Sequence, residues 1–198
     1  MTIKQVFAYY YKEDHHQISE YKYCQLCQTK LVLIGVGHKI RPMCSNCGFV
    51  HYQNPSPVVS VFIVENDSVL LGKRGEEPGK GKWAMPSGHI EYEHDFITTA
   101  ILEAKEETGL DIEVQTISNV ITSYFSPKYH FIVVYLKALV VGGELEAGDD
   151  LEEVRWVRLS EDLPEMAFDE DVEMLGMYAS GELEELPIET KYACQVDI

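Results

Sequence analysis

Beyond residue 57 the chain alternates between short apolar runs and polar turns, a pattern that predicts β-strands. Two of these runs are separated only by the polar residues 65–68, which favours a hairpin. The runs expected to form strands are Val58–Val64, Val69–Leu71, Ile112–Ser118, Val120–Tyr124, Phe131–Val141 and Val154–Arg158.

One segment between these runs has the periodicity of a helix instead. Its apolar residues would form a single stripe along a helix, and they are Ile97, Ala100, Ile101 and Ala104. We therefore expect a helix over Phe96–Thr108, with Asp95 as its N-cap and Gly109 as the residue that ends it. A second helix is expected over Glu170–Ser180.

Two Cys-x-x-Cys pairs lie ahead of this pattern, and their residues are Cys24, Cys27, Cys44 and Cys47. Each pair can form a tight knuckle, and two knuckles complete a closed tetrahedral site for a structural Zn²⁺. Redox-active or merely buried cysteines are the alternative, although a redox motif would need only one pair. The fifth cysteine, Cys194, has no partner in this spacing.

The segment that holds these pairs is too small to bury a core of its own, so a metal would have to stabilise it. The residues Asn54–Pro57 are typical of a linker. The expected units are an N-terminal arm at 1–20, a zinc ribbon at 21–53, a main domain at 57–185 and a C-terminal tail at 186–198.

Composition narrows the possible partners. The chain has 198 residues and a formal net charge of −17, and such a surface repels phosphate backbones. We therefore expect no general binding of nucleic acid. No apolar run approaches the roughly 18 residues that span a membrane, and the first residues show no secretory signal. The paired cysteines favour a metal site over disulfides, so a cytoplasmic location is expected.

The first predicted helix places three carboxylates on one face, those of Glu103, Glu106 and Glu107. Like charges at this spacing repel each other, and they stand near the negative end of the helix dipole. A solvated acidic face is one interpretation. A divalent cation would remove the conflict, because hard cations prefer carboxylate oxygens, so a metal site is the functional interpretation.

The sequence around this helix resembles the Nudix box, G-x5-E-x7-R-E-U-x-E-E-x-G-U, in which U is apolar. The matching residues are Gly88, Glu103, Ala104, Glu106, Glu107, Gly109 and Leu110. The sequence departs from the pattern at His94 and Leu102, where the family has Glu and Arg. Trp83–Gly88 and Glu153–Val157 also resemble the family, and the similarity extends over about residues 57–180.

The resemblance implies an α/β fold, a Nudix-type α/β/α sandwich with a mixed sheet, preceded here by a small zinc ribbon. It assigns binding of catalytic Mg²⁺ or Mn²⁺ to Glu103, Glu106 and Glu107. Gly88 would give the loop room to approach the helix. A further metal carboxylate would come from the loop that holds Asp150, although a plain acidic loop is equally compatible with the residues there.

The resemblance also implies an activity, the metal-dependent hydrolysis of a nucleoside diphosphate linked to another group, as in ADP-ribose, FAD or NADH. Arg74 could contact phosphate, and Tyr124 and Phe125 could stack on a base. A solvated strand end and ordinary aromatic packing are the alternatives for these residues. The two departures keep a second function open, that of a weakened domain that binds nucleotide as a sensor or interaction module.

A homodimer is expected as well. The resemblance to the family supports it, and so does the weak core of the first 50 residues, which a partner subunit could cover.

Overall fold

The computed structural model describes residues 7–8, 21–126, 129–183 and 185–188. Residues 189–198 of the predicted tail, with Cys194, and most of the predicted arm lie outside these residues. The main domain extends past its predicted end at 185, because Leu186–Pro187 form a short strand, β11, that pairs with β8. Within the described part of the chain, no helix is both long and apolar enough to cross a membrane.

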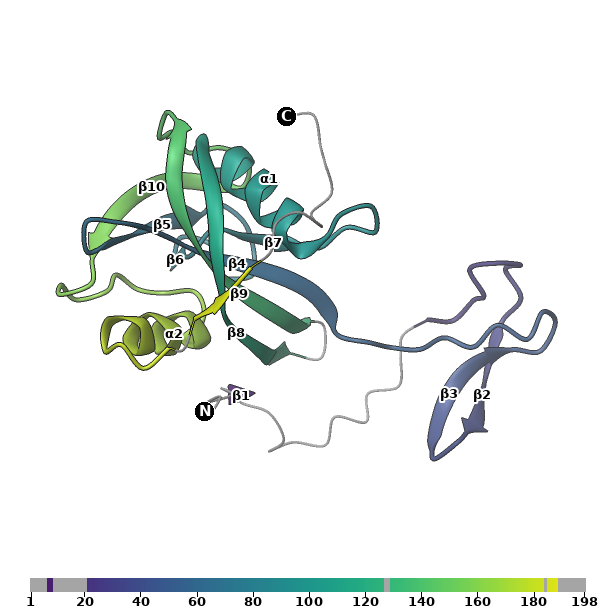
Figure 1. Ribbon diagram of the computed structural model, residues 1–198. Helices are drawn as coiled ribbons and strands as arrows, with labels where there is room; N and C mark the ends of the chain where they lie inside the picture. Colours follow the sequence, from purple (N-terminus) through teal and green to yellow (C-terminus); the bar gives the residue numbers. More distant parts are fainter. Residues whose placement is uncertain (1–6, 9–20, 127–128, 184, 189–198) are drawn as a thin grey trace.

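A mixed sheet forms the main domain, with the strand order β1-β8-β9-β4-β5-β10 (Figure 1). The pairs β4–β9 and β1–β8 are parallel, and the other neighbours along this order are antiparallel. The short strands β6, β7 and β11 pair with β5, β4 and β8. The strands of this sheet are β1 (Phe7–Ala8), β4 (Ser56–Glu65), β5 (Ser68–Arg74), β6 (Trp83–Ala84), β7 (Ser87–His89), β8 (Leu110–Ser126), β9 (Tyr129–Gly143), β10 (Leu151–Arg158) and β11 (Leu186–Pro187).

The central strand β4 is buried on both of its faces. Val59, Val61 and Ile63 belong to a core cluster shared with helix α1 (Phe96–Thr108). Phe62 points to the opposite face and belongs to a second cluster, shared with helix α2 (Asp169–Ala179). Successive side chains of a strand alternate between faces, so an uninterrupted apolar run suits a strand covered on both sides. The expected α/β/α sandwich with a mixed sheet is thereby confirmed.

Helix α1 has the bounds and caps predicted from the sequence. The Asp95 side chain accepts hydrogen bonds from the backbone N–H groups of Ile97 and Thr98, at 2.9 Å each. At the other end Gly109 is left-handed, with φ of 71°, and its N–H bonds to the carbonyl of Lys105. The cap thus fixes where the helix starts, and with it which residues face the sheet.

The two strands predicted over 112–124 are one long strand, β8. It pairs with β9 through register shifts, one of which lies between Ile117 and Asn119. The polar pair Ser118 and Asn119 was therefore a poor boundary signal, because both residues are buried inside the strand. Asn119 bonds to the backbone N–H of Val120 and to the sulfur of Met174, so its polar atoms are satisfied within the core.

The cysteine segment forms a separate antiparallel hairpin of β2 (Leu31–Val36) and β3 (Lys39–Cys44). Among the described residues, no strand of the large sheet pairs with it, and Figure 1 shows it standing away from the sandwich. The predicted linker is shorter than expected, since Ser56 and Pro57 already belong to β4. We call residues 21–53 the ribbon from here on.

Two carboxylates at the N-terminus of α2 are buried against the sheet. Asp171 accepts hydrogen bonds from the hydroxyl of Tyr135 on β9, at 2.9 Å, and from the backbone N–H of Met85, at 3.3 Å. Its neighbour Glu170 accepts one from Ser123 on β8. Burial raises the pKa of Asp171 to about 7. These bonds tie α2 to the loop between β6 and β7.

Asp171 should make the stability of the protein depend on pH. A carboxyl whose pKa is higher in the folded state binds more protons when folded, so the free energy of unfolding falls as pH rises from about 4 to about 7. The slope for one such proton reaches about 1.4 kcal/mol per pH unit. We expect Asp171→Asn to flatten the curve in urea unfolding across this range, whereas Glu173→Gln, an exposed change on the same helix, should not.

Candidate active site

Strand β7 comes unusually close to helix α1 at Gly88. A Cβ atom placed on Gly88 would overlap the carboxylate of Glu103. Only glycine therefore lets the backbone of β7 lie against this side chain. The role expected for Gly88, giving the loop room beside the helix, corresponds to this contact.

Glu107 lies one turn further along the same face and points inward. It is 2% exposed, and its carboxylate accepts a hydrogen bond of 2.9 Å from the backbone N–H of Ser87. Burial raises its pKa well above the usual range, and the charges of Glu103 and Asp150 raise it further. Burial and nearby carboxylates also raise the pKa of Glu103, to about 7.

The third carboxylate comes from the loop between β9 and β10. This loop is fastened to the C-terminal end of α1, where the N–H groups of Glu146 and Gly148 bond to the carbonyls of Thr108 and Glu107, at 3.0 Å each. These bonds satisfy helix carbonyls that would otherwise lack partners. They also bring Asp150 within electrostatic reach of both Glu103 and Glu107.

Arg74 holds Asp150 in place. Its guanidinium lies 3.6 Å from one Asp150 oxygen, donates from Nε to the carbonyl of Pro78 at 2.7 Å, and stands over the Phe168 ring. The Arg74 side chain is only 11% exposed. The structure therefore places Arg74 beside a carboxylate of the site, although the sequence suggested a contact with phosphate.

The arrangement suits a cation. Asp150 Oδ1 is buried and has no hydrogen-bond partner among the described residues, and it stands near two carboxylates with raised pKa values. Buried acceptors are normally satisfied, so such an atom calls for a partner. A divalent ion bound by carboxylate oxygens would neutralise the repulsion and satisfy this oxygen.

Glu106 shares the helix face but is exposed, and its charge raises the pKa of Glu103. The structure thus brings Glu103, Glu107, Asp150 and Gly88 together and leaves Glu106 at the rim. The carboxylates do not all lie within 4.8 Å of one another. Among the described residues only the four cysteines form a group of that kind.

Aromatic side chains lie at the same end of the sheet, on both of its faces. Tyr124 meets His130 edge-on at 5.5 Å across the β8–β9 pair, and Phe131 meets His89, which follows Gly88, at 5.8 Å. Tyr129 lies 6.2 Å from Phe131. The Phe125 side chain lies outside the described residues, so the structure places Tyr124 but gives no position for the other predicted stacking residue.

The four cysteines of the ribbon form one cluster. Their sulfur atoms lie 3.4 to 3.6 Å apart in the Cys24–Cys47, Cys27–Cys44 and Cys27–Cys47 pairs. Four thiolates around a tetrahedral Zn²⁺ at about 2.3 Å would be separated by about 3.8 Å. The cluster is therefore close to the size that zinc requires.

The two knuckles have the same backbone structure. The N–H of Cys24 bonds to the carbonyl of Thr29, and that of Cys44 to the carbonyl of Phe49, at 2.8 Å each. The residues after the second cysteines, Gln28 and Gly48, both have positive φ. This repeat turns the sulfurs of both pairs toward one point.

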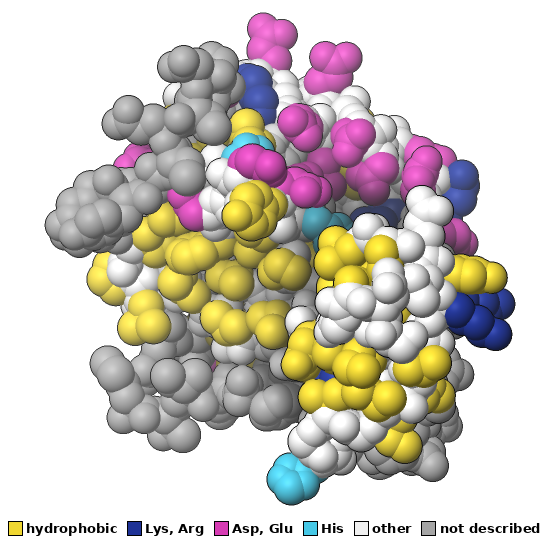
Figure 2. Space-filling view, turned by 90° about the vertical axis from the view of Figure 1, so that its right-hand side faces the viewer, with side chains coloured by type: hydrophobic (Ala, Val, Ile, Leu, Met, Phe, Trp, Pro, Cys, Tyr) yellow, Lys and Arg dark blue, Asp and Glu magenta, His cyan; other side chains and the backbone are white. Residues whose placement is uncertain are grey.

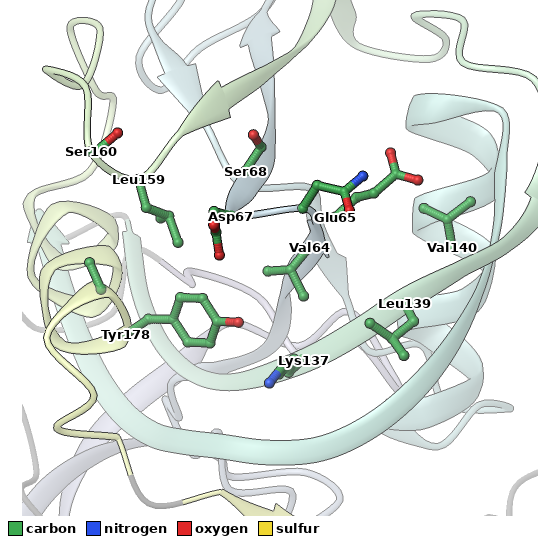
Figure 3. Close-up of a pocket in the computed structure, with 12 residues that line it drawn as sticks. Val64, Glu65, Asp67, Ser68, Lys137, Leu139, Val140, Leu159, Ser160 and Tyr178 are labelled. Atoms are coloured by element: carbon green, nitrogen blue, oxygen red, sulfur yellow. The ribbon is translucent and has the colours of Figure 1, made fainter.

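A cavity of about 970 Å³ opens elsewhere, between the β4–β5 turn, β9 and α2 (Figure 3). Figure 3 shows the Tyr178 ring extending into it, near Lys137. Ser68, which lines the cavity, begins β5, whereas Arg74 ends this strand, and seven residues of strand span about 20 Å. The cavity therefore lies apart from the carboxylates.

Sequence reasoning did not identify two contributors to the site. The backbone N–H of Ser87 binds Glu107, and Glu91 adds to the negative field on Glu103. A backbone donor leaves no signal in residue type. The sequence did offer a signal for Glu91, because this acidic residue lies only three positions after Gly88.

Comparisons with known proteins show what this chain is similar to. A family model described as the NUDIX domain matches residues 54–175. The ADP-ribose pyrophosphatase of Methanocaldococcus jannaschii is 36% identical over 121 residues, which are 61% of this chain and 71% of that protein. The NAD-capped RNA hydrolase NudC of Stutzerimonas stutzeri is 25% identical over 143 residues, 72% of this chain, and this alignment spans only 50% of the relative's length.

Solved structures give the same result for the fold. The crystal structure of a NUDIX hydrolase from Nitrosomonas europaea is similar with a TM-score of 0.72 at 27% identity, and the match covers 81% of this chain and 91% of that one.

Replacing Gly88 tests the contact with Glu103. In Gly88→Ala the new methyl group collides with the end of a flexible side chain, so we expect the Glu103 carboxylate to swing away at a stability cost below about 1 kcal/mol. Calorimetric titration with Mn²⁺ should then show at least about tenfold weaker binding, since one ligand is displaced. Gly176→Ala is the control, because a Cβ there meets nothing within 4 Å. Equal Mn²⁺ affinity in parent and Gly88→Ala would contradict this assignment.

Proposed function

We propose that this chain, which belongs to the NUDIX family, is a hydrolase of the diphosphate bond in ADP-ribose or a related nucleoside diphosphate derivative. In ADP-ribose, water would add to one phosphorus, the P–O bond of the bridging oxygen would break, and AMP and ribose 5-phosphate would leave. The observation that carries the proposal is the convergence of Glu103, Glu107 and Asp150 beside Gly88, with Asp150 Oδ1 buried and unpartnered among the described residues.

The residues of the site would act together to hold Mg²⁺ or Mn²⁺. Glu103, Glu106, Glu107 and Asp150 supply carboxylate oxygens, which these cations prefer. The Ser87 N–H fixes Glu107, and Arg74 fixes Asp150, so the ligands are oriented before substrate arrives. When bound, the cation would neutralise phosphate charge and lower the pKa of an attacking water.

Two observations support ADP-ribose as the substrate class. The archaeal relative with 36% identity carries the name ADP-ribose pyrophosphatase. Phe131 meets His89, the residue after Gly88, so its ring stands at the Gly88 end of the sheet, where a nucleobase could stack on it. NADH and FAD share the same adenosine diphosphate group and belong in the same substrate screen.

The alternative function is that of a nucleotide sensor with a weakened site, based on His94 and Leu102. The backbone N–H of His94 bonds to the carbonyl of Glu91 at 3.1 Å, in the turn before α1. Glu107 is fixed by the backbone N–H of Ser87 and Asp150 by Arg74, and these two contacts involve neither residue. The enzyme is therefore the function that we favour.

A catalytic role for the helix carboxylates predicts opposite effects on activity and on stability. Glu106→Gln keeps the shape of an exposed side chain but removes a charge and a strong metal ligand. We expect AMP release from ADP-ribose to slow by about 100-fold or more, roughly 3 kcal/mol of the barrier. The metal-free protein should gain about 0.2–0.5 kcal/mol of stability, because repulsion along α1 falls.

The matched control is Glu113→Gln, an exposed change on β8 with the same loss of charge, which should keep the parent rate. If Glu106→Gln hydrolyses the best substrate of the screen at the parent rate under saturating Mg²⁺, the metal-site interpretation of this helix is wrong.

We also propose that the ribbon holds one structural Zn²⁺ through Cys24, Cys27, Cys44 and Cys47. Elemental analysis of protein prepared under reducing conditions should give about one zinc per chain. Cys44→Ser should lower this content and unfold the ribbon while the main domain keeps its melting transition, because no strand of the large sheet pairs with the ribbon. Absence of zinc in the parent protein, or disulfides between these cysteines, would refute the assignment.

A further inference from the structure

The charges of this chain are divided unequally between its two modules. The ribbon holds four of the 16 Lys and Arg residues and none of the 33 Asp and Glu residues, which gives it a formal charge of +4. Its cations are Lys22, Lys30, Lys39 and Arg41. The remainder of the chain therefore carries −21, because the whole carries −17. Even with four thiolates around one Zn²⁺, the ribbon stays at about +2.

Figure 2 shows this separation on the surface. Acidic side chains gather over the upper part of the main domain, whereas the ribbon, which projects toward the viewer, shows hydrophobic and basic side chains. The net charge of the chain thus describes neither module. The expectation that the chain does not bind nucleic acid was based on its net charge of −17. That reasoning applies to the main domain and not to the ribbon.

The strand register places two cations of the ribbon on one face. Lys39 and Arg41 are two residues apart on β3, so their side chains share a face, and their partners on β2 are Val36 and Ile34. The Arg41 guanidinium donates from one Nη to the carbonyl of Val36 at 2.9 Å and lies 5.0 Å from the centre of the Tyr52 ring, which leaves its other N–H groups to meet a phosphate. Tyr52 is 54% exposed and adjoins this face through its contact with Arg41. We call Lys39, Arg41 and Tyr52 the basic face.

The other face of the hairpin is different in character. Leu33 and Ile40 lie on it and are 50% and 67% exposed. Neither strand has an acidic residue on this face, and neither has a cation there. Such an apolar surface suits another protein, including the second copy expected for a homodimer. The basic face also presents Val32, which is 45% exposed, but its two cations favour an anionic partner there.

We propose that the basic face of the ribbon binds single-stranded nucleic acid. Lysine and arginine gain by displacing counterions from a phosphate backbone, and an exposed tyrosine ring offers a stacking surface for an unpaired base. Arg41 beside Tyr52 puts a cation and a stacking surface next to each other. A double helix keeps its bases stacked and would use only the charge.

This inference concerns a binding activity of the ribbon and does not depend on the proposed hydrolysis. The ribbon stands away from the main domain, so a strand bound to it would also avoid the field of the acidic surface. RNA and DNA share the chemistry that the basic face would recognise, and the experiment separates them.

The experiment measures binding of the full chain, loaded with zinc, to labelled 12-nucleotide strands by fluorescence anisotropy at several salt concentrations. The probes are oligo(A) RNA, oligo(A) DNA and a duplex RNA of equal length. We expect a single strand to bind more tightly than the duplex. Lys39→Gln/Arg41→Gln should weaken this binding at least tenfold and reduce the salt slope by about 1.4, since two phosphate contacts are lost.

Matched variants separate charge, stacking and folding. Lys80→Gln/Lys82→Gln removes two cations from the main domain and should bind as the parent does. Tyr52→Ala should weaken binding and Tyr52→Phe should retain it, because phenylalanine still stacks. All variants should keep the zinc content and the rate of ADP-ribose hydrolysis of the parent, whatever that rate is.

Several results would overturn the proposal. One is a failure of both single strands to bind at low salt, and another is binding of the Lys39/Arg41 variant equal to that of the parent. Equal affinity for the duplex would show charge attraction without base recognition. Conversion of a dimer to a monomer in this variant, measured by light scattering, would assign the basic face to an interface between copies of this chain.

Discussion

The contact between β7 and α1 is the constraint on which the rest of the main domain depends. Two carboxylates that repel each other are held against a backbone turn, one in the space that glycine leaves open and one on a backbone N–H. In an isolated helix, neither carboxylate would be held in this position. The sheet keeps them there, because β7 pairs with the central strand β4 and the apolar stripe of α1 packs on that same strand.

The loop before β10 completes this arrangement. It covers the end of α1 where the helix dipole is negative, and its N–H groups meet the carbonyls there. The same bonds fix the position of Asp150, so one loop both ends the helix and supplies the third carboxylate. The repulsion among the three carboxylates is thus confined to a small volume, and hydrophobic packing on both faces of the sheet offsets its cost in stability.

Much of this could be predicted from the sequence, for identifiable reasons. The bounds of α1 followed from Asp95, Gly109 and a regular apolar stripe, which are local signals. The strand β8 was divided in two because Ser118 and Asn119 look polar, and only the tertiary contact of Asn119 with Met174 shows how the amide is accommodated in the core. The glutamates were found from their spacing. The Ser87 N–H and the contact of Arg74 with Asp150 were not, because a backbone donor has no residue signature and the partner of a cation depends on the fold.

The parallel pairing of β4 with β9 also governs when the main domain can form during synthesis. Ser56 pairs with Phe131 and Val64 with Leu139, so the central strand must wait until about 75 further residues have left the ribosome. The ribbon needs no such wait, because its register is a hairpin closed by the residues 37–38. Translation therefore releases a module that can fold at once, followed by an exposed apolar strand without its neighbour. During that interval β4 is the segment of the nascent chain most open to wrong pairing or to capture by a chaperone.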